Sequence, residues 1–465
     1  MEQVNEKKSG GFYKQMAALT IPIVLQNLLS AAVNSADVVM LNFVGQSAIS
    51  AVSLAAQFAS ILFMVYYGLG TGATMLSAQY FGKGDLRAIQ VVQGIAMRFS
   101  LVISVIFAAG ALLVPEWMMK IYTPDPELIA LGASYLRILS VAYLCWGVSE
   151  VYLSVLRSVG RAAICTALNT FAFSLNIILN AVFIFGLFGA PKMGVAGVAL
   201  ATSVSRLLEL VLCFVVSARS KDVKLGFSYI FVRNKALFGD FMKMSLPALA
   251  NDVIWGVGFS MYSVIIGHYL GSDAVAANAL ASVVRSYGTI LCFGVASAGG
   301  ILLGQIIGKK DMEGADQGAK KVLRLTVITG AIGGVIILLA MPLILGFADL
   351  TETGHSYLRT MLFINSYYVM GAAVNTTLIA GVFRAGGDSR FGMVCDFIDM
   401  WIYAVPLGFL AAAVLKLPPM WVYFLLCTDE FVKWPWVLKR YFSKKWLKNI
   451  TRDDLFNDNQ PAAEN

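Results

Sequence analysis

Two stretches of this chain repeat each other: residues 45–85, GQSAISAVSLAAQFASILFMVYYGLGTGATMLSAQYFGKGD, and residues 271–311, GSDAVAANALASVVRSYGTILCFGVASAGGILLGQIIGKKD. Identical residues recur at matching positions along the two copies, and one such pair is Gln79 and Gln305. Each copy is a long apolar run that ends in a small basic loop, FGKGD or IGKKD. Two related membrane halves with a substrate path between them are typical of secondary transporters.

The composition places the chain in a lipid bilayer. Hydrophobic residues make up 58% of it and charged residues 13%, and its mean hydropathy is +0.74. A soluble domain is about half apolar and about a quarter charged. The apolar runs are continuous and do not alternate with period two, which predicts a helical bundle and not a barrel. A chain of 465 residues has room for about a dozen membrane-spanning helices.

We therefore predict an all-α integral membrane fold of twelve transmembrane helices in two six-helix lobes. The predicted helices lie near residues 16–44, 50–80, 90–114, 128–157, 163–188, 194–218, 245–270, 274–306, 322–346, 355–383, 391–415 and 419–438. A charged link, 219–243, separates an N-terminal lobe (1–225) from a C-terminal lobe (226–465) that ends in a short cytoplasmic tail. Because six is even, both lobes enter the membrane in the same orientation, and the repeats are parallel.

The Lys and Arg residues indicate which side of the membrane each loop faces. If both termini are cytoplasmic, the outer loops hold only Lys120, Lys192, Arg359 and Lys416, and the inner loops and tails hold most of the others. This bias follows the positive-inside rule. We expect a multi-pass protein of the inner (cytoplasmic) membrane of a prokaryote. The net charge of +8 then reflects topology and attraction to anionic lipids, and no nucleic-acid partner is expected.

Several other function classes lack their motifs in this sequence. The six cysteines are scattered through apolar segments without a CxxC pair, so neither a disulfide framework nor a zinc site is predicted. No phosphate loop of the type GxxxxGK followed by Ser or Thr occurs, so we expect no ATP. The two histidines complete no metal-binding or nucleophilic constellation. We expect a monomer that is not an enzyme and has no cofactor besides a coupling ion.

One acidic residue, Asp37, lies well inside the first predicted helix. A charged side chain at mid-helix costs about 2.5–3.5 kcal/mol on insertion scales, so its presence asks for a reason. Asp37 could change protonation as water access alternates, or it could ligate Na⁺. Asn176 and Asn180 share one face of the fifth helix, and Thr202 lies on the sixth. The alternative is that these groups only hold the helices together by hydrogen bonds.

The second lobe has an acidic set of its own. Asp252 lies in the seventh predicted helix, and Asp396 and Asp399 stand three residues apart in the eleventh, so both can face one cavity. We interpret the three acids as either an anchor for a cationic substrate or a proton relay. The alternative is that they pair with buried bases and keep the lobe folded.

Two further groups of charges are predicted to form ion pairs within a helix. Arg206 and Glu209 stand three residues apart in the sixth helix, and Asp429 and Lys433 stand four apart in the twelfth. Such spacings place the side chains on one helix face. Glu150, in the fourth helix, has no obvious local partner.

These features together resemble the multidrug and toxic compound extrusion (MATE) family, within the multidrug/oligosaccharidyl-lipid/polysaccharide flippase superfamily. The resemblance covers nearly the whole chain. The residues that carry it are Ile21-Pro22, Asp37, Gln79, Leu156-Arg157, Gly160, Asn176, Asn180, Ala201-Thr202, Leu246-Pro247 and Gln305. The resemblance implies cation-coupled export of bulky, often cationic organic compounds by rocking of two lobes.

The resemblance also bears on the candidate sites. In one branch of the family, the first-helix Asp, an Asn and an Asp on the fifth helix, and a Thr on the sixth form a cation site. Asp37, Asn176 and Thr202 match that set, whereas Asn180 stands where the branch often has Asp. The site should therefore hold Na⁺ less tightly. The second-lobe acids of other branches have no counterpart here, since Trp255 stands where those branches have a Glu.

We therefore predict an antiporter, driven by H⁺ or Na⁺, that exports organic and often cationic drugs or toxic compounds from the cytoplasm. Its partners would be small organic substrates and membrane lipids. The alternative is a flippase for a lipid-linked oligosaccharide or another amphipathic lipid. Such flippases usually need a strongly cationic cavity, whereas the acids within the predicted helices are as many as the bases.

Overall fold

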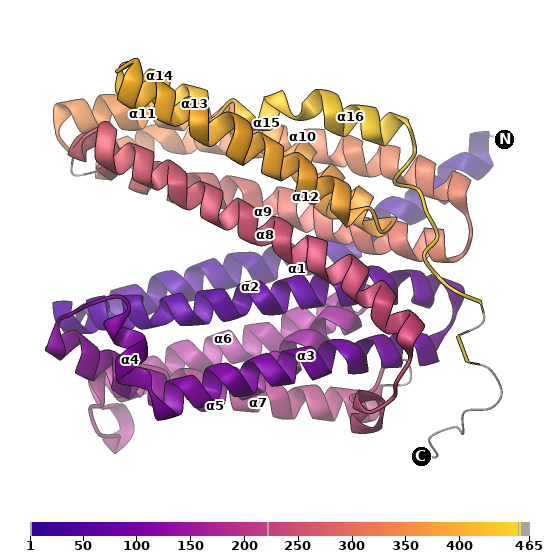
Figure 1. Cartoon of the computed structure of the whole chain (residues 1–465), viewed down its shortest axis with the longest axis horizontal. Coiled ribbons are helices and arrows are strands. Elements are labelled where there is room, and N and C mark those ends of the chain that lie inside the picture. The colour runs from indigo at the N-terminus through magenta and orange to yellow at the C-terminus, as the bar shows by residue number, and fades with distance from the viewer. Residues whose placement is uncertain (1, 221–222, 349, 454, 457–465) are drawn as a thin grey trace. The chain divides into compact units, whose positions relative to one another are not determined.

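The structure, a computed structural model, describes residues 2–220, 223–348, 350–453 and 455–456. Within these residues the chain forms helices and short connections without any β-strand (Figure 1). The predicted all-α membrane fold is confirmed. In the described part of the chain, 11 helices are long and apolar enough to cross a membrane.

The helices of the first half cover the predicted spans, although α1 begins at Glu2 and not near residue 16, and short additions follow the third and the fifth. They are α1 (Glu2–Asn42), α2 (Gln46–Lys83), α3 (Leu86–Leu113), α4 (Pro115–Lys120), α5 (Pro126–Ser158), α6 (Ala162–Phe185), the 3-10 turn η1 (Leu187–Gly189) and α7 (Gly194–Arg219). Local sequence explains several boundaries. The Asp85 side chain caps α3 by accepting from the Ala88 N–H, and Gly84 before it adopts the left-handed conformation.

The second half begins with the 3-10 turn η2 and continues through long helices that become irregular toward the end. Its elements are η2 (Phe227–Ile230), α8 (Lys235–Tyr269), α9 (Ser272–Gly308), α10 (Met312–Phe347), α11 (Glu352–Thr376), η3 (Thr377–Phe383), α12 (Ser389–Phe397), η4 (Ile398–Ala404), α13 (Val405–Phe409), η5 (Leu410–Val414), α14 (Pro419–Leu426), α15 (Asp429–Val432) and α16 (Trp434–Phe442). Asp311 caps α10 as Asp85 caps α3, so the repeated basic loop has the same role in both halves.

Three of these elements are π-helical: η3, η4 and η5. Short π-helical turns inside α-helices are rare and often mark functional sites. Pro406 follows η4 and has no N–H to donate to the carbonyl one turn earlier, which favours the wider turn before it. Asp399 lies within η4 itself.

The twelfth predicted span, 419–438, is interrupted. It runs as α14, α15 and α16 in succession. Pro435 cannot donate to the carbonyl of residue 431, and its ring would clash with that carbonyl, so one continuous helix cannot form. Asp429, Glu430 and Lys433 lie at the interruption, and all three are buried.

The chain packs into two compact units. The first-half unit contains Leu25–Leu246 and the described residues of Arg452–Asn465; the second-half unit contains Pro247–Thr451 and the described residues of Met1–Val24. This grouping differs from a division at residue 225, because the start of α8 packs within the first-half unit. There, Phe238 and Phe241 lie with their ring centroids 5.9 and 6.2 Å from that of Phe99 on α3.

Each unit has a large buried apolar cluster to which one helix contributes many residues. In the first-half unit, α5 contributes Leu136, Leu139 and Tyr143 to a buried apolar cluster that it shares with α2 and α7. In the second-half unit, α11 contributes Leu362 and Val369 to a corresponding cluster. Burial of such side chains, at about 25 cal/mol per Å² of apolar surface, stabilises each unit wherever its neighbours exclude water.

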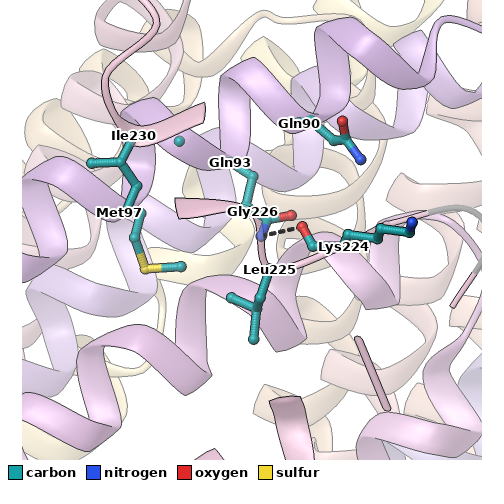
Figure 2. A pocket seen from close by; sticks show the side chains of 8 residues that line it. Gln90, Gln93, Met97, Lys224, Leu225, Gly226 and Ile230 are labelled. Atoms are coloured by element: carbon teal, nitrogen blue, oxygen red, sulfur yellow. Dashed lines mark hydrogen bonds between the residues drawn. The ribbon is translucent and has the colours of Figure 1, made fainter. Parts of the chain in front are cut away.

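The charged link between the two sets of spans is hydrogen-bonded to α3. Gln93 Nε2 donates to the Lys224 carbonyl at 3.3 Å, and Arg98 Nη2 donates to the Val232 carbonyl at 2.6 Å. Figure 2 shows the small pocket that results, which is lined by Gln93 and Met97 of α3 and by Lys224, Leu225, Gly226 and Ile230 of the link. A side chain at Gly94 would collide with the Tyr229 carbonyl, so glycine is required for this approach.

Two glycines four residues apart, Gly330 and Gly334, lie where α10 packs closely against α11. A Cβ at Gly330 would lie 2.9 Å from the Ala373 side chain. A Cβ at Gly334 would overlap the Ser366 carbonyl oxygen. Helices α10 and α11 therefore approach each other closely along this face, as membrane helices with small interfacial residues do.

We expect Gly334→Ala to destabilise the protein by about 1–3 kcal/mol, because the new methyl group forces α10 and α11 apart. The matched control is Gly346→Ala in the same helix, where a Cβ would meet nothing within 4 Å. Thermal unfolding of the purified protein in detergent measures both. Equal melting temperatures for the two variants would contradict the close packing.

Candidate functional site

The predicted polar residues of the first lobe form one chain of hydrogen bonds. Asn180 Nδ2 donates to Asp37 Oδ1 at 2.7 Å and lies 3.3 Å from Asn176 Oδ1. Asn176 Nδ2 in turn donates to Thr202 Oγ1 at 3.2 Å. The Thr202 hydroxyl donates to the Val198 carbonyl at 3.0 Å. Helices α1, α6 and α7 thus each supply part of one polar site.

The helical spacing explains why these groups meet. Each of these three helices carries an apolar residue four positions from its polar one: Leu41 for Asp37, Ile184 for Asn180 and Val198 for Thr202. All three apolar residues belong to the buried apolar cluster of the first-half unit. Residues four apart share a helix face, so the packing of these apolar side chains turns the polar ones toward each other. The sequence pattern identified the residues, and the packing of α1, α6 and α7 brings them together.

The site has unused acceptor capacity. Asn180 is fully buried, and its Oδ1 has no hydrogen-bond partner. No Lys or Arg pairs with Asp37 in the described part of the chain, and Asp37 is only partly buried. A carboxylate without a base, beside an unpartnered amide oxygen, can accept a proton or contribute oxygens to a small cation.

The three acids predicted in the second lobe do not share one partner. Asp252 on α8 pairs with Arg384, with Oδ1 and Nη2 3.1 Å apart. Asp396 and Asp399 both contact Lys433 Nζ, at 3.2 and 3.3 Å. Their three-residue spacing lets both reach the same ammonium group. The geometry therefore includes the buried bases that the alternative interpretation required.

Asn251 connects these two ion pairs. Its Oδ1 accepts from Arg384 Nη2 at 3.0 Å, and its Nδ2 donates to Asp396 Oδ2 at 2.6 Å. Asn251 is the residue before Asp252 on α8, so one helix turn contributes to both pairs. The result is a buried polar network within the second-half unit.

Lys433 is the base that sequence analysis did not assign to Asp396 and Asp399. The pair predicted with Asp429 is not formed, because Lys433 instead contacts Glu430 Oε2 at 3.2 Å. Asp429 Oδ2 accepts a hydrogen bond from Tyr262 at 2.8 Å. The four-residue spacing is a rule for continuous helices, and α15 ends before Lys433. In the sequence, the charged residues Asp429, Glu430 and Lys433 within an apolar span were the local sign of this buried ion cluster.

Ion pairs also occur in the first-half unit. Arg206 Nη1 lies 2.8 Å from Glu209 Oε2, which confirms the predicted pair. Glu150, which had no obvious partner in the sequence, lies 3.8 Å from Arg157. Because each acid here has one base, these contacts are balanced in charge.

The MatE family model matches residues 22–182 and 247–410. The chain is 26% identical over 446 residues to the uncharacterized transporter YisQ of Bacillus subtilis, covering 93% of this chain and 94% of that protein. It is 27% identical over 433 residues to the probable multidrug resistance protein YoeA of the same organism, covering 89% and 90%.

Solved structures show the same fold. An outward-facing multidrug resistance MATE family transporter of the MOP superfamily matches with a TM-score of 0.83, covering 93% of this chain and 96% of that one. A MOP superfamily transporter from Pyrococcus furiosus, described as having a binding pocket of reverse polarity, matches with a TM-score of 0.82. Both share 18% sequence identity with this chain.

Proposed function

Because the chain belongs to the MatE family, a family of multi-pass membrane transporters, we propose that it is an ion-coupled antiporter that exports organic compounds. Inward flow of H⁺ or Na⁺ would drive the export, and substrates would be bulky and often cationic. The relatives named as multidrug resistance proteins support this choice, and a lipid flippase is not favoured. We place the protein in the cytoplasmic membrane of a prokaryote, as a monomer with both termini inside.

The observation that carries this proposal is the hydrogen-bonded set of Asp37, Asn180, Asn176 and Thr202. We assign the coupling ion to it. A proton on Asp37, or Na⁺ held by these oxygens, would remove the unbalanced charge and change what Asn180 can donate to. An ion that binds one conformation more tightly than the other shifts the population toward it. Substrate release would be linked to that shift.

Asn180 limits the strength of the site. With Asp37 as its single carboxylate, the set offers one negative charge and several neutral oxygens. Affinity for a hard cation depends on the number of charged oxygen ligands. We therefore propose weak Na⁺ binding, or coupling through a proton on Asp37. For the network of Asp252, Asp396 and Asp399, we propose a role as proton relay or anchor for a substrate cation.

Transport in proteoliposomes tests the proposal. A pH gradient and a Na⁺ gradient are imposed separately, and we expect a fluorescent organic cation to move only under the gradient of the coupling ion. Liposomes without protein, and liposomes whose gradient is collapsed by an ionophore, are the controls. No movement under either gradient would count against export of organic cations.

A further inference from the structure

The interior of the second-half unit holds more buried acids than bases. Lys433 is surrounded by Asp396, Asp399 and Glu430 at 3.2–3.3 Å, and Asp429 precedes Glu430 on α15. The five side chains are between 0% and 7% exposed. We call them the Lys433 cluster. Four carboxyl groups are therefore buried with one ammonium group, which contacts three of them.

Neighbouring charges do not restore the balance. Arg384 adds one positive charge but is paired with Asp252. Arg285 lies over the rings of Phe259 and Tyr368, at 5.3 and 5.4 Å. Counting both arginines and Asp252 with the cluster, the acids still exceed the bases by two. An uncompensated buried ion costs several kcal/mol, so the fully ionised cluster is not a stable state.

The hydrogen bonds indicate independently that the cluster has too few hydrogen-bond donors. Asp399 is fully buried, and apart from the ion pair of Oδ2 with Lys433 Nζ at 3.3 Å neither of its oxygens has a hydrogen-bond partner. Asn375 donates from Nδ2 to Glu430 Oε2 at 2.6 Å, while its own Oδ1 is also buried without a partner. These atoms are all acceptors. The cluster therefore lacks donors, and a protonated carboxyl group supplies an O–H donor while it removes a negative charge.

We propose that the Lys433 cluster is a second proton-binding site, separate from the Asp37 site, in which a carboxyl group centred on Asp399 holds a proton at neutral pH. The proton comes from water and converts one carboxylate into a carboxylic acid. Lys433 is a positioning residue, because its ammonium holds the carboxyl groups in contact. A proton suits the site better than a metal ion, because no three or more His, Cys, Asp or Glu side chains among the described residues are arranged to hold one.

The groups that face this site come from every helix packed around it. They are Asp252 and Tyr262 on α8, Arg285 on α9, Tyr367 and Tyr368 on α11, Arg384 after η3, Cys395 and Asp396 on α12, Asp399 on η4, Cys427 after α14, and Asp429, Glu430 and Lys433 at α15. The tyrosines and cysteines are neutral near pH 7, and the lysine and arginines are charged. The carboxyl groups are therefore the groups of this site that can bind or release a proton near that pH.

The consequence for transport rests on the proposed function. If export is coupled to protons, each compact unit contributes its own proton site, Asp37 in one and the Lys433 cluster in the other. The two sites can then load and release protons independently, and more than one proton can move for each exported compound.

Infrared spectroscopy of the full-length protein in liposomes tests the cluster without any transport assay. A protonated carboxyl group gives its own C=O stretch, which shifts in D₂O. We expect this band at pH 7 in an Asp37→Asn protein, which removes the first-half site. Adding Asp399→Asn should reduce the band by the amplitude of one carboxyl group. Adding Lys433→Met should increase it, because one more acid must then be neutral.

Two controls accompany these variants. Asp388→Asn removes an acid whose one base, Arg440, lies 2.7 Å away, and it should leave the band unchanged. A folded Asp399→Asn or Lys433→Met variant with an unchanged band would overturn the proposal. If neither variant folds, the absence of any protonated carboxyl band from the Asp37→Asn protein at pH 7 overturns it equally. If the wild-type protein does not transport in proteoliposomes, the proposed function is contradicted, whereas the infrared result still decides whether the cluster holds a proton.

Discussion

Asp37→Asn is expected to lower gradient-driven export by roughly 5–150-fold, the usual range of coupling between two sites. Asparagine cannot take up or release a proton, and it cannot supply a charged ligand to Na⁺. It does keep an oxygen that can accept from Asn180 Nδ2, the bond that spans 2.7 Å in the wild type. The variant should therefore fold and bind substrate while losing its response to the gradient.

The measurement is initial transport rate in proteoliposomes under each gradient, with substrate binding measured separately. The matched control is Asp125→Asn in the same unit, an acid that caps α5 by accepting from the Glu127 N–H at 2.9 Å. Asparagine caps helices about as well as aspartate, so the control should transport normally. If Asp37→Asn transports like the wild type under both gradients, Asp37 has no part in coupling.

Lys433→Met is expected to destabilise the protein by about 3–5 kcal/mol, because it leaves three buried carboxyl groups without their common base. The ammonium is 2% exposed and lies 3.2–3.3 Å from an oxygen of each acid. The loss of stability in Lys433→Met should be smaller at pH 5 than at pH 8, since protonation of the carboxyl groups removes the negative charge that Lys433 balanced. Adding Asp399→Asn should restore part of the stability for the same reason.

The control is Lys444→Met, which removes a base of equal length from an exposed ion pair. Lys444 Nζ lies 3.0 Å from Asp316, but the lysine side chain is 56% exposed. Exposed pairs contribute about 0–1 kcal/mol, so little change is expected. Thermal unfolding in detergent at both pH values compares the variants. The same large loss at pH 5 and pH 8 would mean that Lys433 acts by packing its side chain and not by its charge.

Much of the fold could be predicted because its signals are local. Continuous apolar runs and the repeated basic loops that end at Asp85 and Asp311 predicted membrane helices and the duplication of the two halves. Helical spacing also predicted that Asn176 and Asn180 share a face. These inferences need only the 3.6-residue turn and the cost of exposing polar backbone to lipid. The interrupted span around Pro435 was visible in the residues but was predicted as one helix, since its overall hydropathy outweighed the break.

The sequence by itself therefore determined that this is a duplicated helical membrane protein with an unpaired acid, Asp37, in its first span. Only the tertiary structure decided which distant groups meet: Asp37 with Asn180, Asp252 with Arg384, and Lys433 with Asp396 and Asp399. The reason is physical. The period of one helix fixes which residues share its face, whereas a partner on another helix depends on how whole helices pack. The balance of buried charge is a property of that packing and cannot be obtained from spacing along the chain.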